Sequence, residues 1–152
     1  MNRLLKIHRM NSRHAIPVSN LEGRIFTQPW PYQSIEHEVN ENARAHGWVA
    51  EYQNDVVGYI IGWCFGPEAQ VGTFGVDPRY RRNRIGERLL STLIKNSKSR
   101  SSEAVFLEVR KSNIAAQHLY SKHGFVVSGV RKHYYADNNE DALLMTLSLK
   151  EE

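Results

Sequence analysis

The sequence predicts an α/β fold in which a mixed, mostly antiparallel sheet carries helices on both faces. A strand–helix–strand unit between Gln70 and Val109 requires one parallel pair of strands with a right-handed crossover. Hairpin patterns before and after this unit add antiparallel neighbours, and weak helical segments near the N-terminus supply a second helical layer. The length of 152 residues suits one domain, which we expect to span residues 1–152.

The first part of the chain is predicted to form a short strand, two weak helices and a hairpin. A Pro-rich breaker, Gln28–Tyr32, separates the helices, and Asn54-Asp55 gives the turn of the hairpin. In order, we expect the strand at Leu4–Met10, the helices at about 17–27 and 32–46, and the hairpin strands at Gly47–Glu51 and Val56–Phe65.

The strand–helix–strand unit has the clearest pattern. A strand at Gln70–Val76 ends at Asp77-Pro78, and a helix then runs from about Ile85 to Lys98. Its apolar residues recur at helical spacing and form one stripe: Ile85, Leu89, Leu90, Leu93 and Ile94. In the following strand, Ala104–Val109, alternation places Phe106 and Glu108 on one face.

The C-terminal part is predicted to add one helix and two strands. Asn113 is a good N-cap for a helix over Ile114–Lys122, and Gly124 suits the position just after its end. The segments 125–130 and 142–149 are strand-like, and residues 131–141 between them contain a turn.

Composition excludes several functional classes. Apolar residues make up 41% and charged residues 24%, which is typical of a globular protein. The net charge of +4 suits an anionic ligand but is too small to predict nucleic-acid binding, and we expect none. A single cysteine, Cys64, cannot form an internal disulfide, which fits the cytoplasm. We expect neither a signal peptide nor a membrane span, because no apolar stretch is long enough. His118, His123 and His133 lack metal-binding spacing, so we expect no metal.

Four arginines surround the predicted start of the central helix: Arg79, Arg81, Arg82 and Arg84. The positive end of the helix dipole makes cations unfavourable there. A bound phosphate would remove the conflict, because helix N-termini present unpaired N–H groups to anions. The alternative is that the arginines are simply solvated, and charge alone leaves both interpretations open.

Two further positions are candidates for acid–base chemistry. Glu108 lies in an apolar strand near its C-terminal end, where open α/β sheets place ligands, but a solvent-facing Glu paired with Arg110 or Lys111 is the simpler interpretation. Tyr120 and Asn113 are seven residues apart and so share one helix face, although a Tyr on such a face usually belongs to the core.

Three segments together resemble the GNAT superfamily of acetyl-CoA-dependent N-acetyltransferases: "VDPRYRRNRIGERLL", "VFLEVRKSNIAAQHLYSKHGF" and "RKHYYADNNEDALLMTLSL". Within it they are most similar to the bacterial enzymes that acetylate the N-terminal alanine of a small-subunit ribosomal protein. The resemblance covers the chain from about "FTQPWP" to its end. It implies a GNAT-type sheet, acetyl-CoA as co-substrate and a protein N-terminus as acceptor.

The resemblance also implies roles for individual positions. Glu108 matches the proposed general base and Tyr120 the proposed general acid. Arg84 stands where the pyrophosphate signature of the family has its first glycine. The positions that match cofactor contacts are Phe74, Gly75, Val76, Arg81, Arg82, Asn83, Arg84, Ile85, Gly86, Glu87 and Asn113. The aromatic residues that match the acceptor groove are Trp30, Tyr32, Tyr134 and Tyr135, although each could equally cap the core.

Other functions stay open on the sequence alone. The same transfer could serve a small amine, a polyamine or a lysine side chain. A non-catalytic module that binds acyl-CoA or the ribosome is supported by Arg84 in place of glycine, whereas the presence of both Glu108 and Tyr120 opposes it. RNA binding through Arg131–Tyr135 would require a steep dependence on salt.

Overall fold

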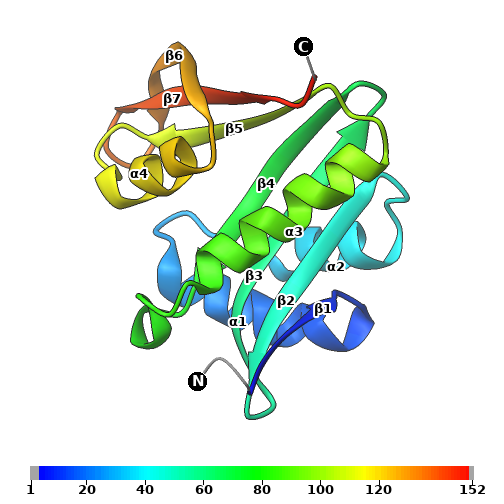
Figure 1. Cartoon of the computed structure of the whole chain (residues 1–152). Helices are drawn as coiled ribbons and strands as arrows, with labels where there is room; N and C mark the ends of the chain where they lie inside the picture. Colours follow the sequence, from blue (N-terminus) through cyan, green and yellow to red (C-terminus); the bar gives the residue numbers. More distant parts are fainter. Residues whose placement is uncertain (1–3, 151–152) are drawn as a thin grey trace.

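The computed structural model describes residues 4–150. Within this part of the chain, seven strands form one sheet in the order β1-β2-β3-β4-β5-β7-β6 (Figure 1). The strands are β1 (Leu5–Arg9), β2 (Ala45–Tyr52), β3 (Asp55–Phe65), β4 (Glu68–Val76), β5 (Ala104–Arg110), β6 (Val126–Tyr135) and β7 (Glu140–Ser148). β4 and β5 are parallel, and every other neighbouring pair is antiparallel. The mixed, mostly antiparallel sheet with a central parallel pair is therefore confirmed.

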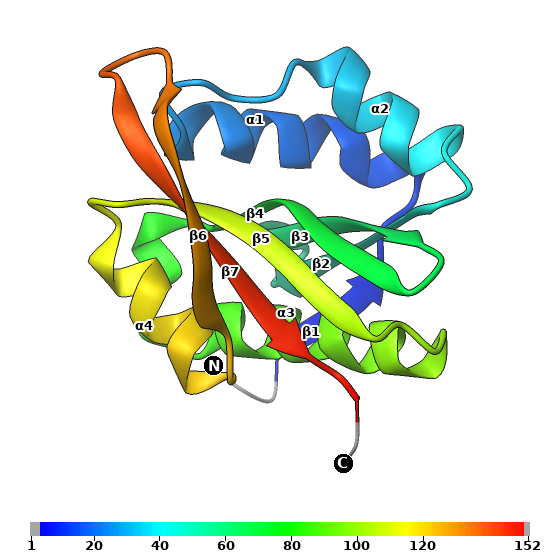
Figure 2. The same cartoon turned by 90° about the horizontal axis from the view of Figure 1, so that it is seen from above.

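Helices cover both faces of this sheet, as predicted (Figure 2). α1 (Ala15–Ile25) and α2 (Tyr32–Asn40) lie on one side, and α3 (Ile85–Ser99) and α4 (Ile114–Lys122) lie on the other. The alternation of β3 divides the core in two. Ile60 packs with the apolar stripe of α3, whereas Tyr59 and Ile61 pack with Val18 and Leu21 of α1. None of the helices in residues 4–150 has the length and apolar character needed to cross a membrane.

Several local predictions are confirmed by hydrogen bonds or dihedral angles. α3 begins at Ile85, and the expected apolar stripe is buried. The side chain of Asn113 accepts a 3.1 Å hydrogen bond from the Ala116 N–H group and so caps α4. Gly124 follows α4 with φ of +94°, a conformation that glycine adopts without steric cost.

Two predicted boundaries are wrong. The helix expected over 32–46 ends at Asn40, because the Asn42 side chain accepts a hydrogen bond from Arg44 N–H and turns the chain into β2. The second error concerns residues 131–135, which were expected in the connection between the last two strands but extend β6 to the pair Tyr135↔Glu140. His133, at φ of +55°, lies in an irregularity of that ladder, so sequence alternation does not reveal the strand.

The parallel pair of β4 and β5 creates an opening in the sheet. β4 and β5 pair only from Glu68↔Ala104 to Gln70↔Phe106. In Figure 1 the two ribbons start together and then diverge towards the C-terminal ends of both strands. The edge of β4 from Val71 to Val76 therefore has no ladder partner on the β5 side among the described residues. Such an edge can form backbone hydrogen bonds with a ligand.

Candidate active site

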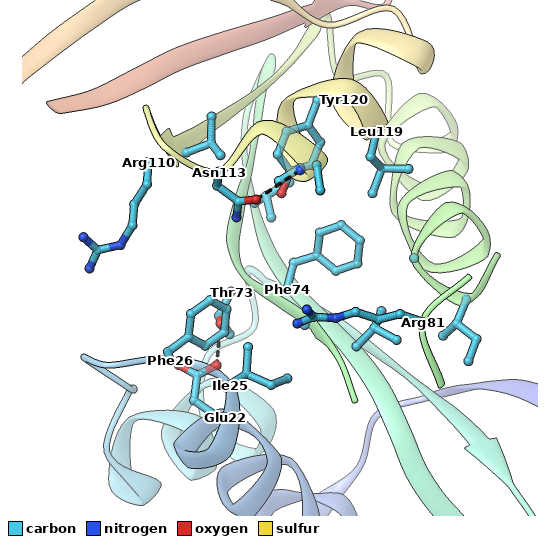
Figure 3. Close-up of a pocket in the computed structure, with 18 of the residues that line it drawn as sticks. Glu22, Ile25, Phe26, Thr73, Phe74, Arg81, Arg110, Asn113, Leu119 and Tyr120 are labelled. Carbon is cyan, nitrogen blue, oxygen red and sulfur yellow. Dashed lines mark hydrogen bonds between the residues drawn. The ribbon is translucent and has the colours of Figure 1, made fainter. Parts of the chain in front are cut away.

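A cavity of about 930 Å³ opens where β4 and β5 diverge (Figure 3). Its walls come from α1, the unpaired part of β4, the loop before α3, the end of β5 and one face of α4. The volume is in the range of ligand-binding pockets. The cavity brings together most of the residues singled out in the sequence: Trp30, Phe74, Gly75, Val76, Arg81, Arg82, Arg84, Ile85, Gly86, Glu87, Glu108, Asn113, Tyr120 and Tyr135.

The N-terminus of α3 forms one end of the cavity. Its N-cap, Arg84, supplies no side-chain hydrogen bond, while the Arg88 N–H group is already bonded to the Arg84 carbonyl at 3.1 Å. The preceding N–H groups of Ile85, Gly86 and Glu87 are the ones that a helix leaves for an outside acceptor. Uncapped N–H groups at the positive end of a helix dipole suit a phosphate or pyrophosphate.

Arg84 adopts the left-handed conformation, with φ of +60°, and its side chain is 82% exposed. Arg84 stands where the pyrophosphate signature of the family has its first glycine, and its backbone keeps the conformation that favours glycine. Arg82 is also left-handed, with φ of +69°. The loop thus has the backbone path of a glycine-containing loop but is built from arginines, which costs conformational energy.

The other residues of this loop have different partners. Arg79 pairs with Asp77 at 2.9 Å, and its hydrogen bond is the main cause that lowers the pKa of that carboxyl group. Arg81 instead extends into the cavity (Figure 3). The Asn83 side chain donates to the carbonyl oxygens of Tyr80 and Arg81, which folds the loop, and Asn83 is not among the described residues that line the cavity.

Glu108 reaches the cavity from β5, with the buried Leu107 and Val109 on the opposite face, as the alternation predicted. Its ion-pair partner is Arg131 of β6, with the Arg131 Nε and Glu108 Oε1 atoms 3.6 Å apart, rather than Arg110 or Lys111. The Glu108 carboxylate also raises the pKa of Tyr134, chiefly through a side-chain hydrogen bond. The side chain of Glu108 is 31% exposed, so water can reach this carboxylate.

Tyr120 of α4 lines the same cavity as Glu108 and is almost fully buried. Its ring packs on Phe74 and Phe125, with centroid distances of 6.3 and 5.8 Å. Burial raises the pKa of Tyr120 above its usual range, and the neighbouring Tyr135 adds to the shift. Within residues 4–150 the hydroxyl group forms no hydrogen bond, so its proton is free for a group bound in the cavity.

The aromatic residues predicted at the acceptor side divide into two pairs. Trp30 and Tyr135 line the cavity, whereas Tyr32 in α2 and the exposed Tyr134 are not among its described lining residues. Tyr134 is nevertheless adjacent, since its ring lies at 5.1 Å from that of Tyr135.

Sequence reasoning missed Glu22. Its carboxylate is buried in α1, lines the cavity and accepts three hydrogen bonds. A signal was available, because Glu22 lies on the same helix face as Val18, Leu21 and Ile25, and a carboxylate in an apolar stripe needs partners. Within residues 4–150, no cluster of three or more His, Cys, Asp or Glu side chains is arranged to hold a metal ion.

Known proteins share this sequence and this fold. Residues 16–125 match the model of the acetyltransferase (GNAT) family. A Bacillus subtilis protein, provisionally named ribosomal protein bS18-alanine N-acetyltransferase, is 39% identical over 134 residues, which cover 88% of this chain and 89% of that protein. The Escherichia coli enzyme named ribosomal protein bS18-alanine N-acetyltransferase is 31% identical over 132 residues, covering 86% and 88%.

A solved structure of an Escherichia coli enzyme has the same fold as this chain. The crystal structure of the ribosomal-protein-S18-alanine N-acetyltransferase from Escherichia coli superposes with a TM-score of 0.90 at 27% identity, covering 97% of this chain and 96% of that one. The family match covers most of the chain, and the relatives match it over nearly their whole length. This chain is therefore an acetyltransferase and belongs to the GNAT family.

Proposed function

We propose that this enzyme transfers the acetyl group of acetyl-CoA to the N-terminal α-amine of a protein, and that the acceptor is a ribosomal protein. One observation carries the proposal: Glu108 and Tyr120, from β5 and α4, line the same cavity that ends at the uncapped N-terminus of α3. The printed names of the Bacillus subtilis and Escherichia coli relatives support the choice of acceptor.

Acetyl-CoA, the acetyl donor of GNAT acetyltransferases, is the co-substrate that we assign to this cavity. The N–H groups at the start of α3, with Arg81 beside them, would hold the pyrophosphate. The unpaired edge of β4 from Val71 to Val76 would bind the pantetheine amides. Bound there, acetyl-CoA supplies a thioester, which an amine can attack without a metal.

Glu108 is assigned the role of general base. An α-amine has a reference pKa near 8, so much of it is protonated at neutral pH and must lose a proton before it can attack. The exposed part of Glu108 admits water, so this carboxylate can take the proton directly or through one water molecule. The contact with Arg131, 3.6 Å from its Nε atom, positions the Glu108 carboxylate at the cavity.

Tyr120 is assigned the role of general acid. Because burial raises its pKa, the phenol is protonated at neutral pH and can donate to the departing thiolate. A backbone N–H group of Phe74, Gly75 or Val76 would stabilise the charge on the thioester oxygen in the transition state. The protein thus supplies proton transfer, one oxyanion-type donor and the joint orientation of both substrates.

Incubation with acetyl-CoA and synthetic peptides tests the function, with release of free thiol as the readout. We expect turnover with peptides that begin with Ala, Ser, Thr or Met, and none with the same peptides carrying a blocked N-terminus. Peptides copied from the N-termini of the ribosomal proteins of the same cell should include the best acceptor. Turnover with polyamines or lysine side chains alone would assign the enzyme to a different acceptor class, and binding without turnover would make it a binding module.

A further inference from the structure

Glu22 connects four parts of the molecule through one buried carboxylate. Its Oε1 atom accepts hydrogen bonds from the Tyr59 hydroxyl group of β3 at 2.5 Å and from the Thr73 hydroxyl group of β4 at 2.6 Å. Its Oε2 atom accepts a 2.8 Å hydrogen bond from the backbone N–H group of Trp30, in the loop between α1 and α2. Figure 3 shows the Glu22 side chain directed at Thr73 from below the cavity.

The three partners of Glu22 all act as donors, so both of its carboxylate oxygen atoms act as acceptors. Within residues 4–150, no Lys, Arg or His pairs with Glu22. Burial and the negative charge of Glu22 raise the pKa of Tyr59, which keeps that donor protonated. Because donors occupy both oxygen atoms and the side chain is only 1% exposed, Glu22 is poorly placed to take a proton from an acceptor.

The Trp30 ring contacts β4 at Gly72, one residue before Thr73. An added Cβ atom at Gly72 would lie 2.9 Å from Cη2 of Trp30 and 2.6 Å from Cη2 of Trp63, so both indole rings rest directly on β4 at this glycine. The two rings stack on each other with centroids 5.7 Å apart. The loop is therefore attached to β4 twice, by the Trp30 ring at Gly72 and by its N–H group through Glu22 to Thr73.

We propose that Glu22 is a positioning residue for acetyl transfer. It holds the Trp30 loop at a fixed distance from the unpaired edge of β4, so that the acceptor amine meets the thioester in one geometry. Thr73 immediately precedes Phe74, Gly75 and Val76, the segment assigned to the acetyl donor. The inference rests on the proposed function, since it takes the Trp30 loop as the acceptor side of the cavity.

The first test needs no substrate. Trp30 lies between Pro29 and Pro31, so its amide is the only one in this tripeptide and can be followed by NMR hydrogen exchange. In the free wild-type enzyme we expect this amide to be protected. In Glu22→Gln an NH2 group replaces one carboxylate oxygen atom and cannot accept the hydrogen bonds that now reach that atom. We expect exchange of the Trp30 amide to accelerate about tenfold, which corresponds to the loss of one hydrogen bond.

The second test separates the two substrates. In Glu22→Gln the KM of the acceptor peptide should rise about tenfold, while acetyl-CoA affinity measured by calorimetry changes less than about twofold. Thr73→Val, which removes one of the two Oε1 donors, should change the KM of the acceptor in the same direction by a smaller factor. Glu51→Gln is the matched control, because Glu51 bonds the buried His14 at 2.9 Å outside the cavity. It should lower stability and leave both the acceptor KM and Trp30 exchange unchanged.

Three results would overturn the inference: unchanged Trp30 exchange, a fall in acetyl-CoA affinity that matches the loss of activity, or the same kinetic change in Glu51→Gln. A failure of the proposed function looks different. In that case the wild-type enzyme would not acetylate peptide N-termini, yet Trp30 exchange would still respond to Glu22→Gln. The KM comparison would then be made with whichever amine the wild-type enzyme accepts, and an unchanged KM would again reject the positioning role.

Discussion

The Thr27 hydroxyl group donates a 2.8 Å hydrogen bond to Oδ2 of Asp137, which joins two segments 110 residues apart in the sequence. Asp137 also receives two hydrogen bonds from Arg110 at the end of β5, at 3.1 and 2.9 Å. The Arg110 guanidinium group in turn lies 3.9 Å from the centroid of the Tyr135 ring. These contacts connect the loop after α1, the end of β5 and the β6–β7 turn at the Tyr135 side of the cavity.

The stability that the Asp137 contacts contribute should be lost at acid pH. Hydrogen bonds from Thr27 and then Arg110 lower the pKa of Asp137, so the carboxylate stabilises the fold above the unfolded value of about 3.9 and loses this effect as pH falls through the lower folded value. Asp137→Asn should therefore destabilise the protein at neutral pH and have little effect well below pH 4. Urea unfolding of both proteins across this pH range measures the difference in stability. The double variant with Arg110→Gln should be less destabilised than the sum of the single variants, and full additivity would contradict the coupling.

Arg84→Gly should stabilise the free enzyme. Glycine adopts the observed φ of +60° without the steric cost that an L-residue carries, and the gain exceeds the added chain entropy of the unfolded state. We expect the free energy of unfolding to rise by about 0.5 kcal/mol. Arg81→Gly is the matched control, because Arg81 has an ordinary φ of −63°, and it should not stabilise. If calorimetry shows weaker acetyl-CoA binding in Arg84→Gly, the Arg84 side chain itself contacts the ligand.

Tyr120→Phe should lower kcat without lowering stability. The ring would keep its packing on Phe74 and Phe125, and the hydroxyl group has no hydrogen-bond partner to lose among residues 4–150. We expect kcat to fall about 100-fold, a common contribution of a general acid. The wild-type rate should not decline from ionisation of Tyr120 up to about pH 10, because burial raises its pKa above that reference value. Rates near wild type for the variant would reject the assigned role.

Glu108→Gln should reduce kcat at neutral pH by about 100-fold and leave acetyl-CoA affinity nearly unchanged. Glutamine has a similar shape but cannot take the proton of the acceptor. Arg131→Gln is the control, since it removes the ion-pair partner and keeps the carboxylate. It should have a much smaller effect on kcat. A variant Glu108→Gln that loses acetyl-CoA binding in proportion to activity would point to a structural role instead.

Much of the fold could be predicted because local and tertiary preferences agree. The apolar stripe of α3, the Asn113 cap and Gly124 each specify their own conformation. The errors occur where long-range pairing decides. Residues 131–135 carry turn-like and charged side chains, yet the ladder with β7 extends them as a strand around His133.

The site was predictable in its motifs but not in its connections. Glu108 and Tyr120 could be named from the resemblance, whereas the partner of Glu108 could not, because Arg131 approaches from another strand. Glu22 and the Thr27–Asp137 contact depend on segments far apart in the sequence, which only the fold brings together. A single sequence contains no record of such pairings.

Acetylation of one peptide with two competing amines tests the central claim most directly. The peptide begins with alanine and contains one internal lysine, and fragmentation mass spectrometry locates the added acetyl group. At neutral pH the α-amine, with a reference pKa near 8, loses its proton more easily than the lysine amine near 10.4. We expect an acetyl group on the α-amine only, formed about 100-fold more slowly in Glu108→Gln. Acetylation at the lysine, or α-acetylation at the wild-type rate in Glu108→Gln, would contradict the proposed function.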